Sequence, residues 1–320
     1  MVFPSAAVKS HRAEREPAPA VRSALVRAHS RQHTCWLPRP SGEKMPSGAS
    51  ASHDIVRSYC FREVVIYFVD GIAVHHYQPA TPNGKPPIVM VHGGMHAAWA
   101  WDQYGQFLAE KGWDCHALDW YNHGQSTALP EADFIKRSHT DLHREILAVS
   151  RQFPAFHLMS HSMGALATLI SSTLLNPESL TLFAPVVPAA VGADPVPMEV
   201  DLTQLFPVPP FEVAKGMFFS TMTDAEAQTY YAKLQPESSQ AVWESARRNV
   251  PVNLAAVRAP TLAVAAGADT LTPPPDIKKL ANMMDATYLE YPGIGHCELL
   301  MKASAWQQVA TDVETWLSKL

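Results

Sequence analysis

The stretch that most constrains the architecture is PAFHLMSHSMGALATLI, which runs from Pro154 to Ile170. An apolar run at 156–159 leads into the sharp turn Ser160–Gly164, and the segment 163–175 that follows is apolar on almost every side. This pattern predicts a buried strand, a tight turn and a central helix. Small residues two before and two after Ser162 let strand and helix pass closely, so a serine here projects above the edge of a sheet. The usual pattern is G-x-S-x-G, and Ser160 replaces its first glycine with another small residue that has less torsional freedom.

Apolar runs alternate with amphipathic stretches on both sides of this turn. Such alternation predicts an α/β fold with a mostly parallel central sheet and helices on both faces. The exception is an early hairpin, in which Asp70-Gly71 forms the turn between strands at 61–68 and 72–77. Further strands are predicted at 88–91, 114–118, 156–159, 180–183, 261–265 and 287–291, and helices at 99–111, 140–152, 163–175 and 303–317.

The alternation stops between residues 185 and 252. Proline-rich connections there link short amphipathic segments at 211–219, 225–234 and 239–247, which predicts a helical cap inserted into the core. The core itself is expected at 58–184 and 253–320. Residues 1–57 are rich in Arg, Pro, Ser and Ala and are expected to be a disordered extension, because they have few side chains that could form a core.

Composition excludes several classes of protein. The 320 residues are 47% hydrophobic and 17% charged, and no apolar run approaches the roughly 20 residues needed to cross a bilayer. Residues 1–50 hold eight Lys or Arg and three Glu, which leaves 17 basic and 27 acidic residues for the rest of the chain. So acidic a body would repel nucleic acid. Four widely spaced cysteines favour free thiols in the cytoplasm, although the Arg-rich start leaves organellar targeting open.

A serine hydroxyl needs a base, a group that orients the base, and donors for a developing oxyanion. Candidates follow Ser162 in the chain order Ser, acid, His. Asp269 follows the strand at 261–265, and His296 follows the last strand beside two glycines that leave its ring room to turn. The backbone N–H groups of Met163, at a helix N-terminus, and Gly94, after His92-Gly93, are the expected oxyanion donors.

These residues resemble the α/β-hydrolase superfamily, in its capped serine hydrolase and esterase form, over roughly residues 60–320. HGGMHAAWAW at 92–101 is similar to the loop of small-ester and methyl-esterase members, and DWYNHGQS at 119–126 is similar to their D-x-R-G-H-G-x-S loop. The resemblance implies the fold, a triad of Ser162, His296 and Asp269, and a cap. Some members carry the acid after the preceding strand, where Asp194 is the nearby carboxylate.

The roles of several flanking side chains are left open. His161 could touch substrate or tuck under the turn, and His96 and Trp99 could line an acyl pocket or pack in the core. Aromatic residues of the insertion, including Phe211 and Phe218, suggest an apolar chamber. Cys297 is expected to be a packed thiol.

No metal site is predicted. His139 and His143 lie four residues apart on one helical face but lack the Glu of H-E-x-x-H, and Ser138 or Thr140 is expected to cap that helix.

The leading hypothesis is a cofactor-free, metal-free serine hydrolase of a small to medium, apolar or aromatic carboxylic ester or lactone. A cofactor-independent ring-cleaving dioxygenase, some of which resemble this chain in carrying S-H-S at the turn, or a C–C bond hydrolase is the alternative. A binding module with a vestigial triad is a third reading. The sequence leaves the oligomeric state open, a homodimer included, as well as the substrate.

Overall fold

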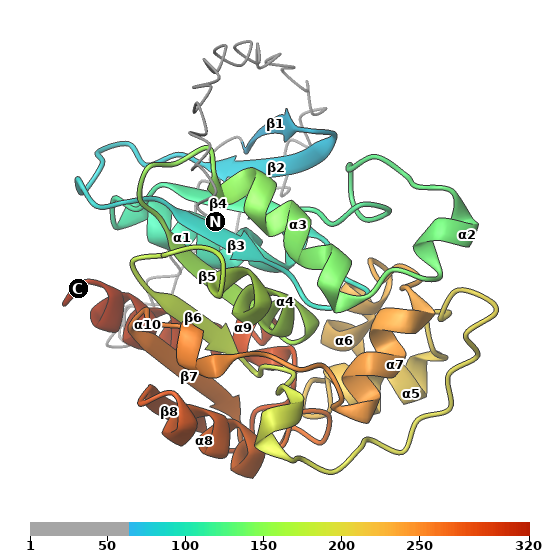
Figure 1. The fold of residues 1–320 in the computed structure, drawn as a ribbon. Helices are drawn as coiled ribbons and strands as arrows, with labels where there is room; N and C mark the ends of the chain where they lie inside the picture. The colour runs from blue at the N-terminus through green and yellow to red at the C-terminus, as the bar shows by residue number, and fades with distance from the viewer. Residues whose placement is uncertain (1–63) are drawn as a thin grey trace, which may run out of the picture.

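The computed structural model describes residues 64–320, and its centre is an eight-stranded sheet in the order β1-β2-β4-β3-β5-β6-β7-β8 (Figure 1). From β4 onward in this order, every strand is parallel to its neighbours on the β8 side. The strands are β1 (Val65–Val69), β2 (Ile72–Tyr77), β3 (Ile88–Val91), β4 (Cys115–Leu118), β5 (His157–His161), β6 (Leu180–Phe183), β7 (Thr261–Ala266) and β8 (Thr287–Tyr291).

The antiparallel part of the sheet is the predicted hairpin. Strand β2 pairs antiparallel with both β1 and β4. Asp70 and Gly71 both have positive φ, 51° and 80°, which is the backbone shape that a tight two-residue hairpin turn needs. The predicted start of the first strand, the extension at 1–57, Cys35 and Cys60 lie outside the described residues.

The sheet is buried on both faces because its central strands are apolar on both sides. In β3, Ile88 and Met90 belong to one core cluster, whereas Val89 and Val91 belong to the other. The first cluster includes Leu108 and Val309 of α1 and α10. The second includes α3 and α4, which pack against each other on the opposite face (Figure 1). This is the layered arrangement that the run of apolar strands predicts.

In the described part, helices follow most of the parallel strands and also occur in the long segment between β6 and β7. That segment contains α5, α6 and α7, which lie together beyond one end of the sheet (Figure 1). The helices are α1 (Asp102–Glu110), α2 (Glu131–Phe134), α3 (His139–Ser150), α4 (Met163–Ser172), α5 (Phe211–Phe218), α6 (Asp224–Tyr231), α7 (Ser239–Arg247), α8 (Pro274–Met283), α9 (Glu298–Met301) and α10 (Trp306–Leu317).

Most predicted elements are present, with small differences at their ends. The helix expected at 99–111 begins as a 3₁₀ turn, Ala98–Trp101, before α1. Ser138 caps α3 as expected: its side chain accepts from the N–H of Thr140, and Asp141 completes a capping box. Helix α8 is not among the predicted helices. It starts with two prolines, which are tolerated in a first turn, where N–H groups have no helical acceptor.

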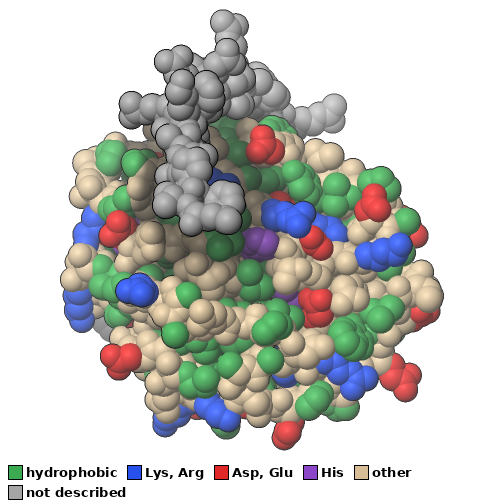
Figure 2. Space-filling model, in the orientation of Figure 1, with side chains coloured by type: hydrophobic (Ala, Val, Ile, Leu, Met, Phe, Trp, Pro, Cys, Tyr) green, Lys and Arg blue, Asp and Glu red, His purple; other side chains and the backbone are tan. Residues whose placement is uncertain are grey.

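Two observations concern the surface of the described part. None of its helices is long and apolar enough to cross a bilayer. On the face seen in Figure 2, basic and acidic side chains are interspersed, and neither sign gathers into one large patch.

Candidate active site

Ser162 occupies the turn between β5 and α4 in a strained conformation, with φ 53° and ψ −120°. Backbone hydrogen bonds hold it there, since its N–H donates to the Phe183 carbonyl (2.9 Å) and its own carbonyl accepts from the N–H of Val186 (3.1 Å). Gly164 is required by close approach, because a Cβ at this position would lie 2.2 Å from the His92 carbonyl oxygen. The turn therefore fixes the Ser162 hydroxyl at the carboxyl edge of the sheet.

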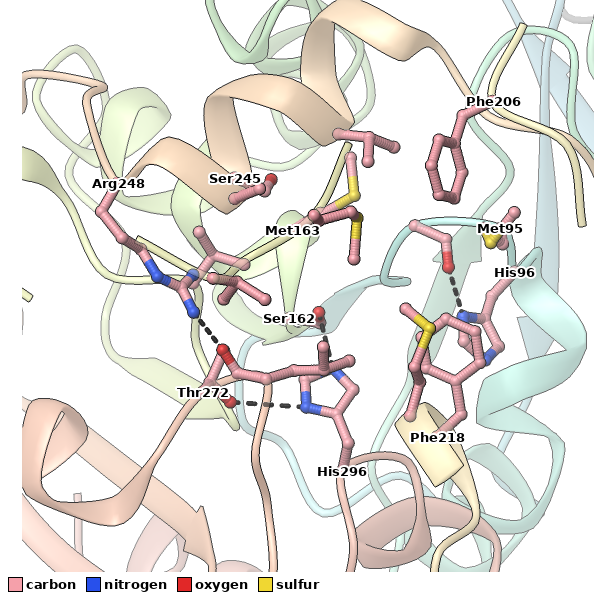
Figure 3. Close-up of a pocket in the computed structure, with 18 residues that line it drawn as sticks. Met95, His96, Ser162, Met163, Phe206, Phe218, Ser245, Arg248, Thr272 and His296 are labelled. Carbon is pink, nitrogen blue, oxygen red and sulfur yellow. Dashed lines mark hydrogen bonds between the residues drawn. The ribbon is translucent and has the colours of Figure 1, made fainter. Parts of the chain in front are cut away.

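Three side chains that are distant in the sequence meet above this edge. His296 Nε2 lies 2.8 Å from Ser162 Oγ, and His296 Nδ1 lies 2.6 Å from Asp269 Oδ2. Figure 3 shows the imidazole of His296 pointing toward the Ser162 hydroxyl. All three residues are buried. Ionised Asp269 accepts from Nδ1–H, which leaves Nε2 as an acceptor for the serine proton.

Asp269 is held by its own loop as well as by His296. The N–H groups of Leu271 and Thr272 donate to Oδ1 (2.8 and 3.0 Å), and the Thr272 hydroxyl donates to Oδ2 (2.6 Å). Burial by itself would raise the pKa of Asp269, but the electrostatic effect of the adjacent His296 and these hydrogen bonds outweigh it, so the pKa lies below its usual value. The exposed Asp194 takes no part in this arrangement.

Gly94 and Met163 lie side by side at the mouth of the turn. A Cβ on Gly94 would come 2.2 Å from Met163 Sδ, and both residues line the pocket that contains Ser162. Met163 is the first residue of α4, so its N–H has no acceptor within the helix. Both residues whose N–H groups are the expected oxyanion donors therefore border the pocket of Ser162.

Glu237, which precedes α7, braces the loop that carries Gly94. Its Oε2 accepts from the N–H of Met95 (2.9 Å), and Met95 has a positive φ of 65°. His123 Nε2 lies 3.3 Å from the same oxygen. Burial by itself would raise the pKa of Glu237, but the charge of His123 and two backbone N–H donors, Met95 and Ser238, hold it below its usual value. The carboxylate therefore stays ionised although it is fully buried.

The contact between Glu237 and His123 also shifts the pKa of His123, which lies above its usual value. Burial would lower the pKa of the imidazole, but the Glu237 carboxylate and the Tyr121 carbonyl, which accepts from Nδ1 (3.2 Å), raise it. This buried ion pair joins the 185–252 segment to two loops of the sheet, the one at 92–95 and the one at 119–126.

Neutral histidines and a thiol surround the triad. Burial lowers the pKa of His96 to about 4, and burial together with the nearby His296 lowers the pKa of His161 well below its usual value. His96 Nδ1 donates to the Gly94 carbonyl (2.6 Å), and its Nε2 lies 3.6 Å from Cys297 Sγ. Burial raises the pKa of Cys297, so it remains a packed thiol.

Two groups of side chains in the described part could in principle hold a metal ion. In the first, ligand atoms of His161, His296 and Cys297 lie within 4.8 Å of one another, but His296 uses both ring nitrogens in the triad. The second is His76 of β2, His116 of β4 and Asp114, which directly precedes β4 and already accepts from His76 (2.5 Å). His139 is not part of either group, since its Nε2 bonds to the Ser245 hydroxyl (2.8 Å).

The pocket over Ser162 has mainly apolar walls, several of them from the 185–252 segment (Figure 3). Of the predicted binding residues, His96 and Phe218 line it. Trp99, His161 and Phe211 are not among its lining residues. The apolar lining from the segment consists of Val186, Val196, Met198, Phe206, Met217, Phe218, Val242 and Ala246.

The residues outside the pocket lining have other neighbours. The Trp99 ring packs beside His96 and stacks on Tyr230. His161 donates to the His296 carbonyl (3.2 Å), and Phe211 packs against Tyr231.

A family model described as the Alpha/beta hydrolase family matches residues 88–312. The chain belongs to this family. It is 28% identical over 261 residues to a 2-hydroxy-6-oxo-6-phenylhexa-2,4-dienoate hydrolase of Burkholderia cepacia, covering 70% of this chain and 86% of that protein. It is also 29% identical over 115 residues to a serine hydrolase-like protein of Dictyostelium discoideum, a match that spans 35% of this chain and only 32% of that relative.

Solved structures share the fold. A serine hydrolase involved in carbazole degradation superposes with a TM-score of 0.59 at 17% identity, covering 81% of this chain and 100% of the other. A methylesterase from Arabidopsis gives 0.57 at 17% identity, covering 74% and 100%. The chain is therefore a hydrolase-family member whose similar proteins include a dienoate hydrolase and a methylesterase.

Three residues of the site were not singled out from the sequence. Thr272 lies three residues after Asp269, where its hydroxyl could have been considered as a partner of the acid. Glu237 and Arg248 belong to the 185–252 segment, and no local motif marks either of them. Their contacts are made across the fold, which spacing does not reveal.

Proposed function

We propose that the protein is a serine hydrolase that acts through an acyl-enzyme on Ser162. The observation that carries this proposal is the continuous hydrogen-bonded chain from Ser162 through His296 to Asp269. His296 would accept the serine proton as Ser162 Oγ attacks the substrate carbonyl. Asp269 would hold the imidazole in the required tautomer and stabilise the imidazolium that forms.

The remaining steps follow from the same groups. The N–H groups of Gly94 and Met163 would stabilise the oxyanion of the tetrahedral intermediate. His296 then returns its proton to the leaving alcohol, and the acyl group stays on Ser162. Water, deprotonated by His296, attacks the acyl-enzyme and releases the acid with the free serine hydroxyl. Every transferred proton passes among Ser162, His296, the substrate and the attacking water, so the steps balance without a cofactor.

The substrate class we favour is a small to medium carboxylic ester or lactone with an apolar or aromatic acyl part. The mainly apolar lining of the pocket supports this choice. We further propose that the 185–252 segment is a cap over the active site, because its side chains form much of the wall facing Ser162. The apolar side chains Met198 and Phe206 would then select the acyl part.

Hydrolysis of a carbon–carbon bond is the second candidate. The similarity to the dienoate hydrolase of Burkholderia cepacia over most of both chains favours it. The dioxygenase alternative receives less support, because Asp269 lies in the loop that suits a hydrolase and is bonded to His296. The ester hydrolase and the carbon–carbon bond hydrolase would use the same pocket, and their products distinguish them.

The test uses three kinds of substrate with the wild-type protein and a Ser162→Ala variant. We expect nitrophenyl esters of increasing acyl length to be cleaved by the wild type and not by the variant, with both proteins melting at the same temperature. Cleavage of 2-hydroxy-6-oxo-6-phenylhexa-2,4-dienoate in preference to any ester would favour the second candidate. Oxygen uptake with an aromatic heterocycle, or full ester turnover by Ser162→Ala, would contradict the proposal.

A further inference from the structure

Arg248 is a buried cation in the wall of an otherwise mainly apolar pocket. It follows α7, is 6% exposed, and lines the same pocket as Ser162 and His296. Figure 3 shows its side chain reaching into the pocket from the end of α7, on the side opposite His96. A guanidinium stays charged when it is buried, so its position requires an account of where its charge is compensated.

The second well-buried arginine of the described part provides the comparison. Arg137 is 7% exposed and forms an ion pair with Glu145, which lies beside it in the structure. Arg248 has no such ion pair among residues 64–320. One of its terminal nitrogens donates to the Leu271 carbonyl, and its Nε is buried without a hydrogen-bond partner. Asp276 and Asp269 act on it electrostatically, but Asp269 is already bonded to His296 and Thr272.

The backbone at Arg248 adds a second observation. The residue has left-handed torsions, φ 54° and ψ 34°, at the position that ends α7. Glycine is the usual residue there, and any other residue in such a conformation is strained. The Arg248 side chain bonds to Leu271 on another loop, whereas capping would direct it to the last carbonyls of α7. Ending the helix therefore does not explain an arginine at this position.

We propose that Arg248 binds a carboxylate of the substrate, so the natural substrate is an apolar acyl compound that also carries a carboxylate group. A carboxylate can accept two parallel hydrogen bonds from a guanidinium and would supply the missing negative charge. The Nε, which has no hydrogen-bond partner in the described part of the chain, would be one of those donors. The proposal rests on the proposed function only for the statement that the bound molecule is hydrolysed. Binding of the carboxylate is a separate property of the pocket.

The experiment compares two esters of similar shape, one of which ends in a carboxylate and the other in a neutral apolar group. The 4-nitrophenyl monoester of adipic acid carries a terminal carboxylate, and 4-nitrophenyl 6-methylheptanoate replaces it with an isopropyl group. We expect the wild type to have the lower KM for the adipate ester. Arg248→Met should raise that KM about tenfold to a hundredfold, and should change the neutral ester less than about threefold. Arg248→Lys should retain part of the preference.

The neighbouring Arg247 provides a matched control, because it is exposed and loses the same charge in Arg247→Met. This variant should leave both esters unchanged. If Arg248→Met instead lowers kcat equally for both esters, the arginine only positions the Leu271 loop and the proposal is wrong. An absence of preference between the esters in the wild type would overturn it without any variant.

A binding measurement separates this proposal from the proposed function. Calorimetry on Ser162→Ala protein would compare 4-phenylbutyrate with 4-phenylbutanamide. Tighter binding of the carboxylate that is lost in Ser162→Ala/Arg248→Met supports the Arg248 site. This conclusion holds even if the wild type hydrolyses neither ester, because a lack of hydrolysis would refute only the ester hydrolase. Equal binding of the two compounds would refute the Arg248 site and leave the hydrolase proposal standing.

Discussion

The side of the pocket that carries Ser162, Asp269 and His296 is built from turns that follow parallel strands, whereas the facing wall comes from a segment inserted between β6 and β7. The first side is held by short, local contacts, such as the three hydrogen bonds that the loop after β7 makes to Asp269. The inserted wall is tied to the sheet through contacts across the fold, of which Glu237 to Met95 is the clearest.

This difference separates reactivity from selectivity. Strand ends converge at one edge in any parallel sheet, so the sheet can keep the reacting groups in place while the inserted segment varies. Changes on the sheet side should therefore affect all substrates alike. Changes in the inserted wall should distinguish between substrates, except where they disturb the loop at 92–95.

The largest effect is expected at Asp269. Asp269→Asn should lower kcat by about 10⁴-fold, because the amide presents the wrong partner to Nδ1 and disfavours the imidazolium. The loss should be the same for short and long esters, as measured by steady-state kinetics. Asp194→Asn, on an exposed side chain, is the control and should have no effect. Equal activity of wild type and Asp269→Asn would mean that another acid serves His296.

Glu237→Gln is expected to have an intermediate effect, because this inserted-wall residue acts on the oxyanion loop. Losing an oxyanion donor costs about 10²- to 10³-fold, and loosening the loop should cost less, about tenfold in kcat with little change in KM. The exposed Glu212→Gln in α5 is a matched control. A rise in KM with unchanged kcat would show that Glu237 shapes only the binding wall.

The same variant makes a prediction about stability and pH. The pKa of Glu237 is lowered on folding. Its contribution to folding stability is therefore present above about pH 4.3 and is lost as the pH falls through the pKa of the folded state. The pKa of His123 is raised on folding. Its contribution to folding stability is therefore complete below about pH 6.5 and is lost as the pH rises through the pKa of the folded state. Thermal unfolding should therefore show a larger loss of Tm for Glu237→Gln at pH 5.5, about 5 °C, than at pH 8.5. An equal loss at both pH values would contradict the ion pair.

The smallest effect is expected for a wall residue without a polar contact. Met198→Ala would enlarge the pocket and should shift the preferred acyl length upward by a few carbons, changing kcat/KM for any one ester by about tenfold or less. The exposed Val213→Ala in α5 is the control. An equal loss of kcat/KM for every ester in the series would show that Met198 affects reactivity, as the residues on the sheet side of the pocket do.

The same contrast explains how much could be predicted from the sequence. The turn at Ser162, the strands beside it, and the residues 269 and 296 have local signals, because strand periodicity and small residues at fixed offsets are properties of short segments. Ser160 in place of glycine did not hide the turn, since a small side chain suffices in β5. Gly94 and Met163 could be named because they adjoin recognisable turns.

The inserted wall could be predicted only in outline. The helices α5, α6 and α7 were expected near their observed positions, but the direction of their side chains depends on how the segment packs over the sheet. His96 and Phe218 reach the pocket, whereas Trp99 and Phe211 pack elsewhere. The roles of Glu237 and Arg248 depend on contacts with residues far away in the chain, and neither residue type is distinctive by itself.

The most direct test of the central claim is to locate a covalent adduct. Wild-type protein treated with a fluorophosphonate should gain the mass of one phosphonyl group, and peptide mapping by mass spectrometry should place it on Ser162. Asp269→Asn should react much more slowly, and Ser162→Ala should not react. An adduct on another residue, or an unmodified wild type under conditions that label a control esterase, would contradict the account.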